Sequence, residues 1–135
     1  MLPCDRRRAP SFETSRQAGR YGERVAARFL KRQGYKLLLE NVAIGRGEID
    51  LVCREGDVLA FVEVKTRADS RYGEPSQAVD AQKRAKLVRA AQFYLQELRN
   101  PEILYRFDIA EVFLSAGQVP SCRLIRDAFG VQPRS

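Results

Sequence analysis

The chain has 135 residues, of which 44% are hydrophobic and 30% are charged, a balance typical of one globular domain with its own core. No stretch approaches the roughly 18 consecutive apolar residues of a transmembrane helix, so we expect no membrane-spanning segment. The net charge is +7 and histidine is absent, which excludes Ser-His and Cys-His nucleophile pairs and the usual His-containing zinc sites.

The basic charge lies in the first third of the chain. Residues 1–46 hold 11 basic and 4 acidic side chains, whereas residues 47–135 hold 13 of each. Nineteen of the 24 basic side chains are arginine, whose planar fork matches phosphate oxygens, and this favours a polyanionic partner. The alternative is a basic surface that only keeps the protein in solution.

Residues 1–16 lack the apolar segment of a secretory signal and predict a flexible basic tail. Apolar side chains then recur at helical spacing over residues 17–33, which predicts an amphipathic helix that ends at Gly34. The expected apolar stripe contains Tyr21, Val25, Ala26, Phe29, Leu30 and Gln33, and the basic side chains opposite it are Arg20, Arg24, Arg28 and Lys31. Glu23 lies at the border of this stripe, so we expect it to face the body of the protein.

Three strands are predicted next. Residues 35–41 form the first, and a glycine-rich connection over residues 42–47 follows. Residues 48–54 and 58–65 then alternate between apolar and polar side chains, the pattern of two further strands. Glu55, Gly56 and Asp57 between them are turn residues, so this pair should form an antiparallel hairpin.

The second half of the chain predicts one helix and two strands. A polar loop over residues 67–76 leads to a helix capped by Ser76 or Asp80 and stopped by Asn100-Pro101. Its expected inward face contains Val79, Val88, Ala91, Tyr94, Leu95 and Leu98. Strands follow at residues 104–114 and 119–126, so we expect an α/β fold with the order αβββαββ and a mixed sheet of about five strands flanked by helices.

Strict alternation in the hairpin places three acidic side chains on one face. Glu48 and Asp50 share a face with Val52, while Ile49, Leu51 and Cys53 point to the other. Glu63 and Lys65 likewise share one face of the next strand.

The register of the hairpin decides whether these side chains meet. A turn centred on Gly56 sets Asp50 opposite Phe61 and Glu48 opposite Glu63. Asp50 and Glu63 are then diagonal neighbours, with Cβ atoms roughly 7 Å apart. One small divalent cation between them would bind both carboxylates.

Carboxylates within apolar strands need a partner, because an ionised group shielded from water is costly. Oxygen ligands of this kind suit Mg²⁺ or Mn²⁺, which keep several waters and accept phosphate oxygens. Such an ion would polarise a phosphodiester and lower the pKa of a bound water, with Lys65 orienting that water or stabilising charge on the phosphate. The alternative is an ordinary sheet face on which Glu63 and Lys65 form weak cross-strand ion pairs.

Two motifs resemble the YraN-like family of small bacterial proteins. They are GEIDL at residues 47–51 and FVEVKTR at residues 61–67. The similarity extends over roughly residues 18–126, with further matches at Gly22-Glu23, Gly34-Tyr35, Asn41, Gly73, Pro75, Ala78-Val79, Lys83, Tyr94-Leu95 and Arg106-Phe107-Asp108.

That family is similar to the PD-(D/E)XK nucleases, which have a restriction-endonuclease-like fold. The resemblance implies a metal site built from Asp50, Glu63 and the backbone carbonyl of Val64, with Lys65 as the catalytic lysine. Glu23 matches a helix glutamate that completes the acidic cluster in the resolvase-like branch. Ile49 stands where the proline of the superfamily's name would be.

The resemblance also implies that a residue of the helix after the hairpin reaches the site, and Gln82 and Lys83 are the two candidates. Arg46, in the glycine-rich connection, would contact a phosphate backbone or form part of a plain turn. Arg67 would track a nucleic-acid strand or remain solvated. Asp108, in an apolar strand, is expected to pair with Arg106 or with backbone groups rather than to act in catalysis.

The leading hypothesis is a Mg²⁺- or Mn²⁺-dependent endonuclease that cuts DNA, including branched or single-stranded intermediates. It comprises a single nuclease-like domain over residues 17–127 and a C-terminal tail over residues 128–135. Three widely spaced cysteines, an odd number, favour a reducing cytoplasm. A nucleic-acid-binding module with little activity is the second hypothesis, and a protein-interaction domain with a structural ion-pair network is the third. A homodimer stays open, because the two strands of a duplex call for two sites.

Overall fold

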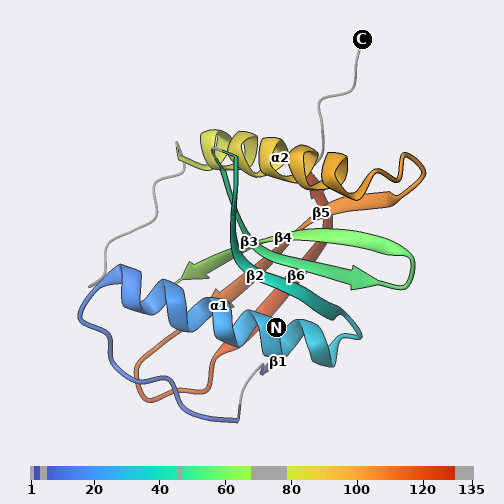
Figure 1. Cartoon of the computed structure of the whole chain (residues 1–135). Coiled ribbons are helices and arrows are strands. Elements are labelled where there is room, and N and C mark those ends of the chain that lie inside the picture. The colour runs from blue at the N-terminus through green and yellow to red at the C-terminus, as the bar shows by residue number, and fades with distance from the viewer. Residues whose placement is uncertain (1, 4–5, 46, 68–78, 130–135) are drawn as a thin grey trace.

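The computed structural model describes residues 2–3, 6–45, 47–67 and 79–129. It contains a mixed sheet of strand order β1-β6-β5-β4-β3-β2, with α1 against one face and α2 against the other (Figure 1). The elements are β1 (Leu2–Pro3), α1 (Ser15–Arg32), β2 (Lys36–Ile44), β3 (Gly47–Glu55), β4 (Val58–Arg67), α2 (Val79–Leu98), β5 (Leu104–Phe113) and β6 (Ser121–Phe129).

The predicted α/β order of helix, three strands, helix and two strands is confirmed, and it is consistent with a restriction-endonuclease-like fold. β4 and β5 pair in parallel, and the other neighbouring strands pair antiparallel. A parallel pair needs a long crossover, and α2 provides it. The structure adds the two-residue strand β1 at the edge of β6, which the sequence pattern did not predict.

Helix α1 begins two residues before the expected start because Thr14 caps it. The Thr14 hydroxyl accepts a hydrogen bond from the backbone N–H of Gln17 at 3.1 Å. At the other end Gly34 has a φ of +94°, a left-handed conformation that glycine adopts without strain. The predicted stop at Gly34 is therefore confirmed.

Each face of the sheet has its own apolar cluster. The cluster under α1 includes Val25, Phe29 and Leu30 of that helix, together with Leu51, Cys53 and Val62 of the sheet. The cluster under α2 includes Leu87, Ala90 and Ala91 of that helix, together with Val52, Phe61 and Phe107. Leu98, expected on the inward face of α2, is 41% exposed, so that expectation was wrong.

The turn between β3 and β4 lies one residue further along the chain than predicted. Glu55 pairs with Val58, which leaves a two-residue turn that begins at Gly56, where φ is +59°. Phe61 consequently lies opposite Val52 and not opposite Asp50. The predicted register was wrong by two residues, but a shift of two keeps every side chain on the face that alternation assigned to it.

Ile49 is an exception to the predicted alternation. The register pairs of β3 and β4 end at Leu51 and Val62. Beyond this point Ile49 packs in the cluster under α2 together with Val52, instead of sharing a face with Leu51. β3 still pairs with β2 at this point, where Ile49 lies opposite Val42.

Parts of both expected tails pack on the sheet. β1 pairs with Ser121 and Cys122 at the start of β6. Ala9 is 3% exposed, and its backbone N–H donates to the carbonyl of Gln118 at 2.7 Å. At the other end β6 continues to Phe129, whose ring stacks on Phe107 with centroids 5.2 Å apart.

Neither of the described helices has the length and apolar character needed to cross a membrane.

Candidate metal centre

The site lies where the ladder between β3 and β4 ends. After the Leu51–Val62 pair, an Asp50 carboxylate oxygen accepts a hydrogen bond from the backbone N–H of Val64 at 2.8 Å. Continuing the register by one residue sets Asp50 opposite Glu63. The observed register therefore brings the two carboxylates closer than the predicted diagonal arrangement.

Glu63 is buried, and its carboxylate lacks hydrogen bonds to the described residues. The residue is 2% exposed, and neither carboxylate oxygen has a hydrogen-bond partner within the described parts of the chain. Lys83 Nζ lies 3.8 Å from Oε1, too far for a hydrogen bond but close enough for electrostatic attraction. Burial raises the pKa of Glu63, and the positive charges of Lys83 and Lys65 oppose this increase only in part.

Asp50 has a similar electrostatic environment. Burial raises its pKa above the ordinary value, while the hydrogen bond from Val64 and the charge of Lys83 lower it. The charge of Asp50 in turn raises the pKa of Glu63. Two neighbouring carboxylates that both resist ionisation are stabilised most by a cation placed between them.

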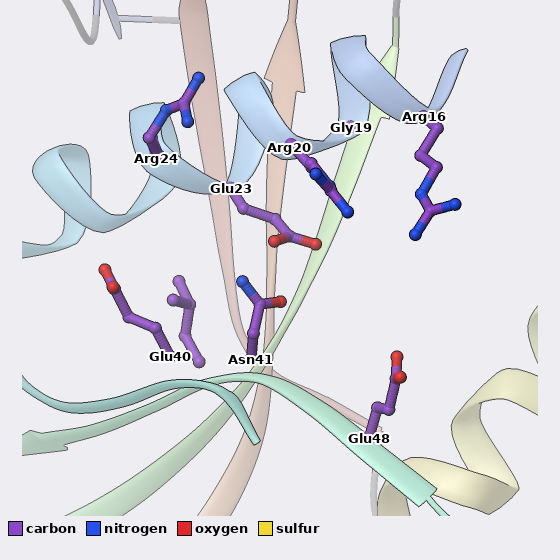
Figure 2. A pocket seen from close by; sticks show the side chains of 9 residues that line it. Arg16, Gly19, Arg20, Glu23, Arg24, Glu40, Asn41 and Glu48 are labelled. Atoms are coloured by element: carbon purple, nitrogen blue, oxygen red, sulfur yellow. The ribbon is translucent and has the colours of Figure 1, made fainter. Parts of the chain in front are cut away.

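Glu23 approaches from the other side of the strands. Gly22 makes this possible, because a Cβ at that position would lie 2.0 Å from the Thr66 hydroxyl oxygen on β4. Burial raises the pKa of Glu23, a side-chain hydrogen bond with Asn41 lowers it, and the charge of Asp50 raises it. Figure 2 shows Glu23 reaching down from α1 toward Asn41 of β2.

Two cavities meet at Glu48. One, of about 690 Å³, lies between α1 and the β2–β3 pair, and Glu23 lines it (Figure 2). The other, of about 360 Å³, lies between β3, β4 and α2, and contains Asp50, Glu63 and Lys83. Glu48 lines both cavities, so the acidic side chains form a continuous series across the end of the sheet.

Arginines of α1 border the first cavity at intervals of one helical turn. They are Arg16, Arg20 and Arg24. The helical pattern had placed Arg20 and Arg24 opposite the apolar stripe, and their connection with the acidic site was missed. The spacing of four residues was the available signal, because it keeps side chains on one helix face.

The available ligands suit a cation that keeps part of its water. In the described ranges no three Asp, Glu or Cys side chains are placed to hold a metal ion by themselves. Asp50 and Glu63 offer two carboxylates. The Val64 carbonyl faces the same side as its N–H, which is bonded to Asp50. Mg²⁺ commonly uses one or two carboxylates with waters and substrate phosphates, so this oxygen-only set and the unpartnered Glu63 fit such an ion.

The remaining predicted site residues are placed as follows. Lys65 is half-buried on β4 and close enough to Glu63 to lower its pKa. Of the two candidates on α2, Lys83 reaches the site, whereas Gln82 is exposed and lines neither cavity. Arg67 Nε lies 3.7 Å from a Glu111 carboxylate oxygen, and Arg46 lies outside the described residues.

A second polar cluster surrounds the buried carboxylate of Asp108, which lies beside Val62 of β4. The predicted pairing of Asp108 with Arg106 is confirmed, with Arg106 Nε 3.0 Å from one carboxylate oxygen. The Tyr35 hydroxyl and the backbone N–H of Asp127 also donate to this carboxylate, at 2.7 and 2.8 Å. Burial raises the pKa of Tyr35 to about 12, and Asp108 contributes in the same direction. Glu55 joins the cluster through Arg106, a contact that no sequence pattern indicated.

Comparison with known proteins identifies relatives along most of the chain. A family model described as uncharacterised protein family UPF0102 matches residues 22–112. A UPF0102 protein of Symbiobacterium thermophilum is 46% identical over 115 residues, which cover 85% of this chain and 98% of that protein. A UPF0102 protein of Caldicellulosiruptor saccharolyticus is 38% identical over 115 residues, covering 84% and 98%. One of Syntrophotalea carbinolica is 47% identical over 94 residues, covering 70% and 76%.

Proposed function

This chain belongs to the uncharacterised protein family UPF0102, as its resemblance to YraN-like proteins indicated, and we propose that it is a metal-dependent endonuclease hydrolysing phosphodiester bonds in DNA. The observation that most supports this proposal is Glu63, a buried carboxylate with no hydrogen-bond partner in the described chain, beside Asp50 and two lysines. A buried carboxylate that accepts no hydrogen bond and faces only a half-exposed lysine at 3.8 Å is destabilising, so its presence favours a functional role.

In this proposal the site is of the PD-(D/E)XK type. Asp50, Glu63 and the Val64 carbonyl would hold Mg²⁺ or Mn²⁺, which when bound would polarise the phosphodiester and lower the pKa of a water. Lys65 would orient the attacking water or stabilise negative charge developing on the phosphate. Lys83, whose ammonium group is already near Glu63, would counter the same charge from α2.

Glu23 has a positioning role in the proposal. Its carboxylate is fixed by Asn41 and lies within electrostatic reach of Asp50. Glu48, which borders both cavities, connects Glu23 to the proposed metal centre. Together they would hold hydrated cations near the reacting phosphate without completing a cage around them.

DNA is the proposed substrate because basic side chains border the acidic site. Arg16, Arg20 and Arg24 line the cavity that contains Glu23. None of the three has a carboxylate within 4.0 Å among the residues described, so their charges are available to phosphates. A cytoplasmic location and a homodimer with two sites are part of the same proposal.

The direct test is incubation of the full chain with linear, single-stranded, flapped and branched DNA in Mn²⁺ or Mg²⁺. We expect Glu63→Ala and Lys65→Ala each to lower the cleavage rate by at least about a hundredfold. Lys31→Ala, in the last turn of α1, is the matched control for a lost lysine and should cut like the parent. Failure of the parent on every substrate, or equal cutting by Glu63→Ala, would refute the enzymatic function.

A nucleic-acid-binding module without turnover is the second candidate. The observation that favours it is the Lys83–Glu63 ion pair, which already provides a positive charge for Glu63, together with the lack of a third placed carboxylate in the described chain. This candidate predicts salt-sensitive DNA binding that needs no metal. Calorimetric titration with Mn²⁺ distinguishes the two, because binding that Asp50→Asn abolishes would support the metal enzyme.

A further inference from the structure

A third cavity adjoins the candidate metal centre and has a different chemistry. It has a volume of about 360 Å³ and is lined by Ile44 at the end of β2, by Gly45 and Gly47, and by residues of α2 beside the buried Ala90. It shares Gly47 and Lys86 with the cavity that contains Asp50 and Glu63. We call it the Phe93 cavity, after the ring at its edge.

Phe93 is the most exposed aromatic side chain in the described part of the chain, at 53%. Its ring rests against Gly45, where a Cβ would lie 3.3 Å from two ring atoms. Gly45 also has a φ of +58°, which favours glycine. Gly45 thus covers one side of the Phe93 ring, while about half of the surface of Phe93 remains open to solvent.

Two cations accompany this ring. Lys86 and Arg89 line the cavity, both are exposed, and neither pairs with a carboxylate among the described residues. Among the described residues that line the cavity, none is acidic. An open aromatic face beside unpaired cations is the combination with which proteins bind single-stranded nucleic acid, since the ring stacks on a base and the cations hold phosphates.

The Phe93 cavity is also continuous with the reacting centre. Lys83, Lys86 and Arg89 follow one another at intervals of three residues on α2, about 4.5 Å of helix rise each. Lys83 is at the carboxylates, and Phe93 lies about 15 Å further along the helix axis. A strand with its phosphate at Asp50 and Glu63 can therefore extend along α2 to the ring.

We propose that the Phe93 cavity is a subsite for an unpaired nucleotide, whose base stacks on Phe93 and whose phosphates contact Lys86 and Arg89. The inference rests on the proposed function, because the strand it holds is the one presented to Asp50. A base paired within a duplex has no free face for the ring, so the subsite favours single-stranded or branched DNA over continuous duplex.

The test is equilibrium binding of the full chain to a single-stranded oligonucleotide containing 2-aminopurine, in EDTA so that no cleavage occurs. Stacking on Phe93 should quench the fluorescence of this base. Phe93→Ala should weaken single-strand binding about tenfold or more and abolish that quenching, whereas Phe93→Trp should preserve both. Leu98→Ala, which shortens another exposed apolar side chain of α2, is the matched control and should bind like the parent.

Two further measurements test the role of the cations and the preference for single-stranded DNA. Lys86→Ala and Arg89→Ala should each reduce the salt dependence of single-strand binding, and Phe93→Ala should leave duplex binding unchanged. Equal single-strand affinities of the parent and Phe93→Ala, or no single-strand binding by the parent, would overturn the inference.

Cleavage in Mn²⁺ is scored separately, so the two proposals fail in different ways. Phe93-dependent quenching without cleavage supports the subsite and refutes the nuclease. Cleavage that does not depend on Phe93, with no quenching in EDTA, refutes the subsite and supports the nuclease.

Discussion

Replacing Glu63 by glutamine should stabilise the protein when no divalent cation is present. The carboxylate is 2% exposed and has no hydrogen-bond partner among the described residues. Burial raises its pKa above the ordinary value of 4.5, so the folded state binds this proton more tightly than the unfolded chain does. Stability contributed by that proton is present at acidic pH and is lost as pH rises through the folded-state pKa.

Three opposing energies determine how much Glu63→Gln should stabilise the protein. Moving an ionised carboxylate out of water costs several kcal/mol. Lys83, at 3.8 Å, returns about 1 kcal/mol if water screens the pair and about 4 kcal/mol at an effective dielectric constant of 20. Half of the Lys83 side chain is exposed, so the lower value applies better. Because the glutamine amide also lacks partners, the net gain for Glu63→Gln is about 1 kcal/mol at neutral pH.

Thermal unfolding measures this gain as a rise in Tm of about 4 °C in EDTA at pH 7.5. Added Mn²⁺ should reverse the order, since free ion at 100 times Kd stabilises only the parent, by about 2.7 kcal/mol. The glutamine variant should also lose less stability than the parent as pH rises above the ordinary glutamate value of 4.5.

The matched control is Glu111→Gln, which removes a buried glutamate that accepts two hydrogen bonds from Arg123. Here the loss of charge-assisted hydrogen bonds should destabilise the protein by about 1.5–3 kcal/mol, with or without Mn²⁺. If Glu63→Gln is instead less stable than the parent in EDTA, the lysines already compensate the buried carboxylate and the argument for a cation fails.

Two further predictions concern the scaffold. Gly22→Ala should lower the free energy of unfolding in urea by about 1–3 kcal/mol, because the added Cβ would lie 2.0 Å from the Thr66 hydroxyl oxygen. Gly19→Ala is the control: no atom lies within 4 Å of its Cβ position, so this change should stabilise α1 by up to about 1 kcal/mol. Equal effects would contradict the close approach of α1 to β4. Asp108→Asn should cost about 3–5 kcal/mol, because it removes the buried charge that Arg106 faces, and a loss below 1 kcal/mol would show that the cluster is not structural.

The sequence predicted the helices and strands well where residues close together in the chain determine where an element begins or ends. The end of α1 at Gly34 and the hairpin at Gly56 follow from glycine's access to positive φ. The start of α1 was missed by two residues because the Thr14 cap lies before the apolar stripe begins. β1 was missed because a two-residue strand has no period to detect.

The candidate site was predicted in its residue types and only partly in its geometry. Asp50 and Glu63 were expected to converge, and an incorrect register still gave the correct face because it was wrong by an even number of residues. Alternation put Ile49 on the face of Leu51, whereas it packs in the cluster under α2. The choice of Lys83 over Gln82 needed the packing of α2 on the sheet.

The sequence by itself determined the order of helices and strands, the side of the sheet on which the acids lie and the excess of arginine near the N-terminus. These properties depend on residue spacing and composition, which a linear chain already contains. Only the tertiary structure decided that Glu63 is buried without a hydrogen-bond partner in the described ranges, that Lys83 lies beside it and that Phe93 is open at the next cavity. Desolvation and Coulomb energy depend on distances between segments far apart in the chain, and folding alone sets those distances.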